Sequence, residues 1–190
     1  MYKLCKTEQS AARQRQLEQG LLQAMLQQPY EEISISDLCD RLGVPRKSFY
    51  RYFSSKDGAL AALVDHTLME YEQEMPNLKR TKKRDAVEDM ERYFEFWQEK
   101  KALLDALERS GLSGILVERS TFHAVRERMM PKYLVGLPAD KQSIALTFAV
   151  CGLLAMVIQW HHNGYQQTVR EIAEVATMML TRPLISGETE

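Results

Sequence analysis

Cationic and phenolic side chains lie close together between residues 46 and 56 of this 190-residue chain. Arg46 and Lys47 have donors that suit the O6 and N7 atoms of guanine in a DNA major groove. Tyr50, Tyr52 and Lys56 carry the hydroxyl and ammonium groups that commonly bind phosphate oxygens. These residue types and their spacing therefore predict binding to duplex DNA.

Two short helices joined by a tight turn would position these side chains within the segment 33–56. Ser34 and Asp37 form a predicted capping box at the start of the first helix. Gly43 supplies the left-handed conformation that ends it, and Pro45 suits the first position of the second helix. The pattern is that of a DNA-binding helix-turn-helix, whose second helix enters the major groove. Two further hydroxyl groups, one on each helix, belong to Ser36 and Ser48.

The same spacing also fits a plain helical hairpin with solvated charges, because such hairpins occur as packing motifs. The sequence favours DNA binding through its resemblance to the TetR (tetracycline-repressor-like) family of regulators. The matching residues are 43–44, 49–53, 55–56 and 59–60, within about the N-terminal third of the chain. The resemblance implies an all-α homodimer with an N-terminal three-helix helix-turn-helix DNA-binding domain and a C-terminal helical dimerisation and ligand domain.

The resemblance also implies individual DNA contacts. The family's base contacts fall on Arg46, Lys47 and Ser48, its phosphate contacts on Tyr50, Tyr52 and Lys56, and a further DNA-facing site on Ser36. Two prolines depart from the family pattern: Pro29 replaces a usual glycine, and Pro45 replaces a common small polar residue. Neither removes a cationic or tyrosyl contact, but the loop before Ser34 is expected to take a different path.

Composition limits the alternatives. The net charge is −1, with nine Lys or Arg against seven Asp or Glu in residues 1–60, and sixteen against nineteen in the remainder. Affinity for DNA must therefore come from the local placement of cations. The three cysteines are scattered, which predicts a reducing cytoplasm and neither a disulfide framework nor a metal site. The N-terminal residues lack the apolar core of a secretory signal, and nothing indicates a cofactor.

Helical periodicity divides the chain into three parts. We expect a DNA-binding domain at 1–55, which includes a first helix over Thr7 to Gln27, and a linking helix at 56–76 that starts at a Ser54 and Asp57 cap. Residues 77–190 would form the dimerisation and effector domain. A basic run at 79–84 is expected to be a solvated connector, with a second nucleic-acid contact as the minor alternative.

The C-terminal part offers an interface and a possible pocket. The apolar run 144–158 is shorter than the roughly 20 residues that span a membrane, so we expect a buried helix. Together with a last helix capped by Thr168 and Glu171, it would form a four-helix bundle with its symmetry mates. His161 and His162 are expected to be an ordinary helix end. Candidate ligand-pocket residues, each of which plain core packing also explains, are Tyr93, Phe94, Trp97, Phe122, His123, Met129, Met130 and Tyr133.

The sequence thus predicts a transcriptional regulator, most often a repressor in this family, whose dimer reads an inverted repeat and responds to a small-molecule effector. The alternative is a protein-interaction adaptor or coactivator of the same fold that does not bind an operator. An all-helical enzyme finds little support, because there is no phosphate loop, paired carboxylate site or nucleophile with an evident base.

Overall fold

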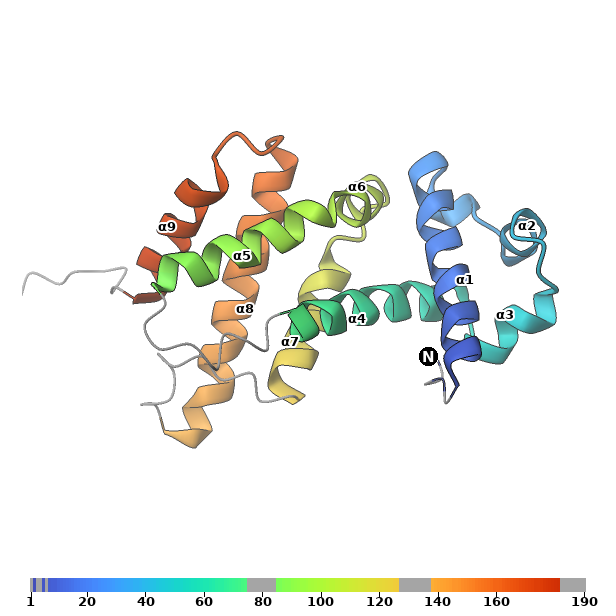
Figure 1. Cartoon of the computed structure of the whole chain (residues 1–190), viewed down its shortest axis with the longest axis horizontal. Helices are drawn as coiled ribbons and strands as arrows, with labels where there is room; N and C mark the ends of the chain where they lie inside the picture. The colour runs from blue at the N-terminus through green and yellow to red at the C-terminus, as the bar shows by residue number, and fades with distance from the viewer. Residues whose placement is uncertain (1, 3–4, 6, 75–84, 127–137, 182–190) are drawn as a thin grey trace, which may run out of the picture. The chain divides into compact units, whose positions relative to one another are not determined.

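The computed structural model describes residues 2, 5, 7–74, 85–126 and 138–181, and within these ranges the chain is almost entirely α-helical. The predicted all-α fold is confirmed (Figure 1). A single 3-10 turn, Tyr30–Glu32, precedes the second helix. The helices are α1 Glu8–Gln27, α2 Ile35–Arg41, α3 Arg46–Tyr52, α4 Lys56–Glu74, α5 Ala86–Glu99, α6 Lys101–Arg109, α7 Gly114–Arg126, α8 Ala139–His162 and α9 Val169–Thr181.

The chain divides into two compact units. Unit 1 comprises Met1–Tyr71 and Ala102–Arg119, and unit 2 comprises Glu72–Lys101 and Ser120–Glu190. Helices α4 and α7 each begin in unit 1 and end in unit 2, and α6 belongs to unit 1 except for its first residue, Lys101. The predicted domain boundaries at 55 and 76 remain a prediction.

Unit 1 is built on α1, which begins where the sequence predicts. The Thr7 hydroxyl accepts a hydrogen bond from the backbone N–H of Ser10, at 3.3 Å, and so caps the helix. Leu17 and Leu21 are fully buried on one face of α1, and Phe49 of α3 and Phe53 after it are also buried. This apolar core fixes α3 within the unit.

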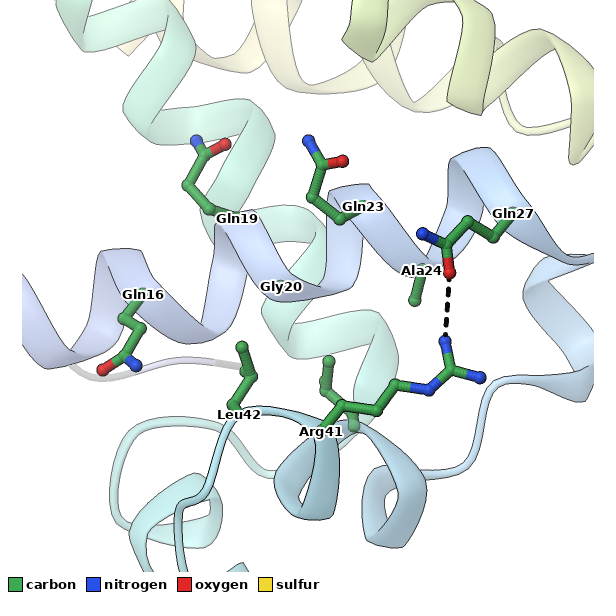
Figure 2. Close-up of a pocket in the computed structure, with 9 residues that line it drawn as sticks. Gln16, Gln19, Gly20, Gln23, Ala24, Gln27, Arg41 and Leu42 are labelled. Carbon is green, nitrogen blue, oxygen red and sulfur yellow. Dashed lines mark hydrogen bonds between the residues drawn. The ribbon is translucent and has the colours of Figure 1, made fainter.

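A close contact between the α1 backbone and a leucine side chain joins α1 to the end of α2. Gly20 of α1 leaves room for the side chain of Leu42, which follows α2. Figure 2 shows the groove beside this contact, of about 360 Å³, with glutamine side chains of α1 along it. The Arg41 guanidinium donates to the side-chain oxygens of Gln27 and Gln28, at 3.4 Å each. Leu42 is partly exposed at the groove.

Unit 2 is built mainly from α5, α8 and α9. Phe94 of α5 packs edge-on against Trp160 of α8, with ring centroids 5.7 Å apart. The Trp160 indole N–H donates to the carbonyl of Gln167, at 2.9 Å, which fixes the turn between α8 and α9. The predicted cap of α9 is confirmed, because the Thr168 N–H and hydroxyl both donate to the Glu171 carboxylate at 2.8 Å.

Helix α8 is longer than the apolar run 144–158, whose length predicts a helix too short to cross a membrane. Its segment Asp140–His162 has 23 residues, and by length and composition alone this segment could span a membrane. Only 28% of its most apolar window is buried within the chain. The helix exceeds the apolar run 144–158 because it continues through polar residues at both ends. The helix end at His161 and His162 was predicted correctly.

Two cap assignments need correction. The hydroxyl of Ser55, rather than that of Ser54, accepts the N–H of Gly58 at the start of α4, at 3.1 Å. Pro45 is the N-cap of α3 rather than its first helical residue. Both shifts are a single residue, because neighbouring positions in a turn can serve the same free N–H groups. The basic run 79–84 and the pocket candidates Met129, Met130 and Tyr133 lie outside the described residues.

Candidate nucleic-acid interface

The turn between α2 and α3 forms as its sequence predicts. The Ser34 hydroxyl accepts the backbone N–H of Asp37, at 3.0 Å, and donates to the Asp37 carboxylate, at 2.7 Å. Gly43 has a φ of 62°, in the left-handed region that favours glycine. The N–H of Val44 reaches the carbonyl of Cys39 at 3.0 Å, while the N–H of Gly43 reaches that of Asp40 at 3.2 Å. These two bonds make a Schellman cap that ends α2 sharply.

Helix α3 separates an apolar face from a polar one. Phe49 is fully buried, and Val44 just before the helix is buried with it. Positions 46, 47, 50 and 51 are exposed and share one side of the helix, since 46 and 50, and likewise 47 and 51, are four residues apart and 47 and 50 are three apart. Tyr50 is 48% exposed. The resulting surface carries three cations and a phenol, all exposed to solvent. It begins at the N-terminus of the helix, the end at which recognition helices contact bases.

The remaining predicted DNA contacts occupy different surroundings. Ser36 in the first turn of α2 and Ser48 on α3 are partly exposed, so both hydroxyls lie near the surface. Tyr52 is only 7% exposed, and its ring packs against that of Phe53, with centroids 6.2 Å apart. The structure therefore groups Arg46, Lys47 and Tyr50 on one open face and places Tyr52 in the core beneath it.

Lys56 makes hydrogen bonds within the chain. Its ammonium donates to the carbonyl of Ile33 at 2.9 Å, to that of Glu31 at 3.4 Å, and to that of Tyr30. The same ammonium lies 4.2 Å from the centre of the Tyr30 ring, a cation–π contact. Lys56 thus holds the 3-10 turn against the start of α4. Its role as a phosphate contact stays a prediction.

Tyr30 makes a second contact between the 3-10 turn and the start of α4. Its hydroxyl donates to the carboxylate of Asp57 at 2.7 Å, and its side chain is 6% exposed. Burial raises the pKa of Tyr30 well above its usual value, and the bond to Asp57 raises it further. The phenol is therefore a neutral donor at physiological pH. The loop after Pro29 is fixed by two consecutive residues of α4, Lys56 and Asp57.

Sequence reasoning missed a group of buried polar residues at the middle of α4. Asp65 is 1% exposed and is paired with Arg119 of α7, while Glu18 of α1 is 2% exposed and contacts His66 at 2.8 Å. The only signal in the sequence was the Asp-His pair inside an apolar helical stripe. Charged residues in such positions are almost always paired when buried.

The pocket candidates in unit 2 are not gathered on one surface. Tyr93, Phe94 and Trp97 are buried on α5, with ring centroids of Tyr93 and Trp97 6.5 Å apart. His123 of α7 is 8% exposed and lies 3.6 Å from the carboxylate of Glu72, whereas its neighbour Phe122 is 53% exposed. Within the described residues, no three His, Cys, Asp or Glu side chains gather as a metal site would require. The effector pocket stays a prediction.

Known proteins are similar to this chain in sequence over part of unit 1 and in fold over most of its length. Residues 20–63 match the profile of the family described as bacterial regulatory proteins, tetR family, a range that contains all of α2 and α3. No curated protein sequence matches the chain. A tetR-family transcriptional regulator from Streptomyces coelicolor is similar in structure, with a TM-score of 0.58 and 17% identity over 90% of this chain and 79% of that one. A TetR transcriptional regulator from Rhodococcus sp. RHA1 gives a TM-score of 0.48 and 19% identity, over 89% and 96%.

The fold and the exposed face of α3 define a helix-turn-helix DNA-binding protein. Residues 20–63 form a DNA-binding domain of the kind found in the tetR family of bacterial regulatory proteins, as the sequence predicts, and the chain is a DNA-binding transcriptional regulator.

Proposed function

We propose that the chain is a dimeric repressor that reads an inverted-repeat operator in the cytoplasm and is released by a small-molecule effector. The observation that carries the proposal is the pairing of an open cationic face on α3 with a second, uncovered apolar face on α8 and α9. The first suits DNA, and the second suits another copy of the chain.

Base contacts in this proposal come from Arg46 and Lys47, with Ser48 beside them. Phosphate contacts come from Tyr50 and from Ser36, whose position near the N-terminus of α2 suits an anion. Lys56 and Tyr52 act mainly by holding the site in shape, because Lys56 donates to backbone carbonyls and Tyr52 is buried. Their direct contact with phosphate, which the resemblance implies, would then add to that role.

The dimer would form through the apolar face of α8 and α9. Ile144 and Phe148 are 70% and 66% exposed, and Gly152 and Ala155 continue the same exposed stripe at helical spacing. Small residues at two of these positions let another helix approach closely. The face extends onto α9, where three more apolar side chains are 42–47% exposed: Val175, Met178 and Met179. Two copies joined here would make a four-helix bundle and cover surface that water disfavours.

An effector, in this proposal, would bind among the aromatic residues of unit 2. Tyr93, Phe94 and Trp97 form a buried aromatic cluster, and aromatic side chains commonly line pockets for apolar ligands. The pair His123 and Glu72 would add polar groups to such a ligand site. The linking helix at 56–76 would carry the response to the DNA-binding domain.

Selection of duplexes from random DNA tests the proposal. The purified chain should enrich an inverted repeat whose half-site centres lie about 34 Å apart or at a multiple of that distance. Sedimentation should give the mass of two chains. Binding that shows no sequence preference at moderate salt would contradict operator recognition and favour the adaptor function instead.

A variant of the apolar face separates dimerisation from DNA contact. Phe148→Asp should give single chains that keep their helical content and bind an isolated half-site, because a charge opposes burial in the bundle. Gln159→Asp on the same helix, beyond the apolar residues of the stripe, is the matched control and should remain dimeric. A Phe148→Asp protein that is still a dimer would place the interface elsewhere.

A further inference from the structure

A groove with apolar walls lies between α1 and α2 in unit 1 (Figure 2). Its volume is about 360 Å³, near the lower end of the roughly 300 to 1,000 Å³ that small-molecule pockets occupy. Gly20 and Ala24 line it from α1, and Leu38 and Leu42 line it from α2 and its C-cap. Because Leu42 is only partly buried, a further apolar side chain that entered the groove would remove apolar surface from water.

Four glutamines of α1 form one edge of this groove. They are all exposed and follow one another at spacings of three or four residues, at positions 16, 19, 23 and 27. Each amide offers both donors and an acceptor and carries no charge. Such an edge suits the N–H and C=O groups of an extended polypeptide, whereas the phosphates of a nucleic acid need cations along their path.

An arginine lies at each end of this row of glutamines. Arg13 donates to the side-chain oxygen of Gln16, at 2.8 Å. Arg41 donates to the side-chain oxygens of Gln27 and Gln28, at 3.4 Å each. Both guanidinium groups therefore bond to neutral amides, and among the described residues no carboxylate pairs with either of them. Since a guanidinium bonds more strongly to a carboxylate, through two parallel hydrogen bonds, charge complementarity favours an acidic partner.

The two arginines also set the length of the segment that fits. Gln16 and Gln27 are eleven residues apart on α1, which corresponds to about 16 Å along a helix. An extended peptide covers this distance with about five residues. Carboxylates about five positions apart would therefore reach both arginines, with an apolar side chain between them against Leu42.

The groove and the DNA side of α2 lie on different faces of that helix. Leu38, Arg41 and Leu42 share the groove face, because they are three or four residues apart. Ser36, a candidate DNA contact, precedes Leu38 by two residues, which is about 200° around a helix. A segment in the groove therefore leaves the surface at Ser36 open.

We propose that the groove between α1 and α2 is a docking site for an acidic, extended segment of a partner protein. The segment places an apolar side chain against Leu42 and carboxylates on Arg13 and Arg41. The site lies within one unit of a single chain and needs neither an operator nor an effector. It goes beyond the proposed function, because it gives the regulator a protein partner that can be held while DNA is bound.

Selection of peptides tests the site directly. Random ten-residue peptides displayed on phage are selected against the purified full-length chain at 0.15 M salt, where attraction between exposed charges more than about 8 Å apart is largely screened. We expect enrichment of peptides with two acidic residues about five positions apart and a bulky apolar residue between them. A selection that enriches no peptide, or only peptides without this pattern, would overturn the proposal.

Charge reversal tests the contact with Arg41. The best selected peptide is made with capped ends and a fluorescent label, and anisotropy measures its affinity. Arg41→Glu should weaken binding about tenfold or more, and a peptide with lysine in place of the matching acid should recover most of the loss. Lys47→Glu, on the exposed face of α3, is the matched control and should change binding by less than about twofold. Equal losses in the two variants, or no recovery by the lysine peptide, would contradict docking at Arg41.

The amide edge and the position of the apolar side chain have their own tests. Gln23→Ala should weaken the peptide about threefold or more by removing hydrogen bonds to its main chain, whereas Gln98→Ala, an exposed glutamine of α5, should have no effect. Far-UV circular dichroism and thermal unfolding establish that each variant is folded. A benzophenone group at the apolar position of the peptide should cross-link to α1 or α2. Equal binding by the two glutamine variants, or cross-links confined to unit 2, would count against the site.

Competition with DNA separates this site from the proposed function. The peptide should bind with the same affinity, within about twofold, in the presence of a saturating selected duplex. Displacement by the duplex would place the peptide on the DNA-binding face and overturn the proposal. A parent that binds no duplex would contradict the proposed function, whereas the peptide measurements would still decide the docking site. Self-association of the chain that Arg41→Glu abolishes would assign the groove to a second copy and overturn the proposal as well.

Discussion

Gly20 of α1 and Leu42 at the end of α2 touch so closely that a β-carbon at position 20 would lie 2.5 Å from Cδ1 of Leu42. This contact sets the distance between the first helix and the helix-turn-helix. Because the groove beside Leu42 is open, as Figure 2 shows, the leucine side chain has space to turn away.

Substitutions at Gly20 should therefore depend steeply on size. Gly20→Ala should change the free energy of unfolding by less than about 1 kcal/mol, because the helix propensity of alanine offsets the movement of Leu42. Gly20→Leu should destabilise by about 2 kcal/mol or more, since α2 itself must move. Urea unfolding measures both. Gly114→Ala at the start of α7, where an added β-carbon meets no atom within 4 Å, is the control for an added methyl group without a neighbouring contact.

Removal of the Lys56 ammonium should lower stability as well as DNA affinity. Lys56→Met keeps the aliphatic chain beside Tyr30 but leaves the carbonyls of the 3-10 turn without their charged donor. We expect a loss of about 1 to 3 kcal/mol in the free energy of unfolding. Lys47→Met, on the exposed face, should change stability by no more than about 0.5 kcal/mol. Equal stability of the two variants would leave Lys56 as a phosphate contact alone.

The exposed face of α3 should separate base recognition from phosphate binding. Arg46→Ala or Lys47→Ala should reduce the free-energy difference between correct and incorrect bases. We expect a loss of about 1 to 3 kcal/mol for each two-point contact with a base that the substitution removes. Tyr50→Phe should weaken binding to all sequences by a similar factor, since its hydroxyl serves phosphate. Competition binding with single-base variants of the selected operator measures the difference. Uniform losses at Arg46 and Lys47 would show that neither reads bases.

The cap of α9 should respond to acid. Hydrogen bonds from the backbone N–H and the hydroxyl of Thr168 lower the pKa of Glu171 below its usual value of 4.5. Because the folded-state pKa is depressed, the carboxylate stabilises the helix above about pH 4.5, and this contribution is lost as the pH falls through the folded pKa. Glu171→Gln should therefore lower Tm at neutral pH, and the difference should shrink near pH 3. Glu174→Gln, which lies outside the cap, should show no such convergence.

Local features of the interface were predictable from the sequence because their hydrogen bonds span few residues. The caps at Ser34 and Thr168 and the turn at Gly43 each depend on hydrogen bonds that span three to five positions. The opposite faces of α3 follow from helical spacing alone. Such elements are determined before any long-range packing is known.

Long-range contacts were not predictable in the same way. Lys56 and the carbonyl of Ile33 are 23 residues apart, and Arg119 and Asp65 are 54 apart, so only the packed fold brings each pair together. Sequence spacing carried no information on these contacts. The sequence therefore predicted a phosphate contact for Lys56 but not its hydrogen bonds within the chain. Phe122 was grouped with the pocket because of its residue type, although α7 leaves it half exposed.

The exposed apolar stripe that includes Ile144 and Phe148 makes a monomer of this chain prone to nonspecific association. Exposed apolar side chains along this 24-residue helix favour nonspecific adsorption to other apolar surfaces, such as another polypeptide or a lipid layer. In the proposed dimer this stripe is covered, so dilution to single chains would expose it again and favour adhesion.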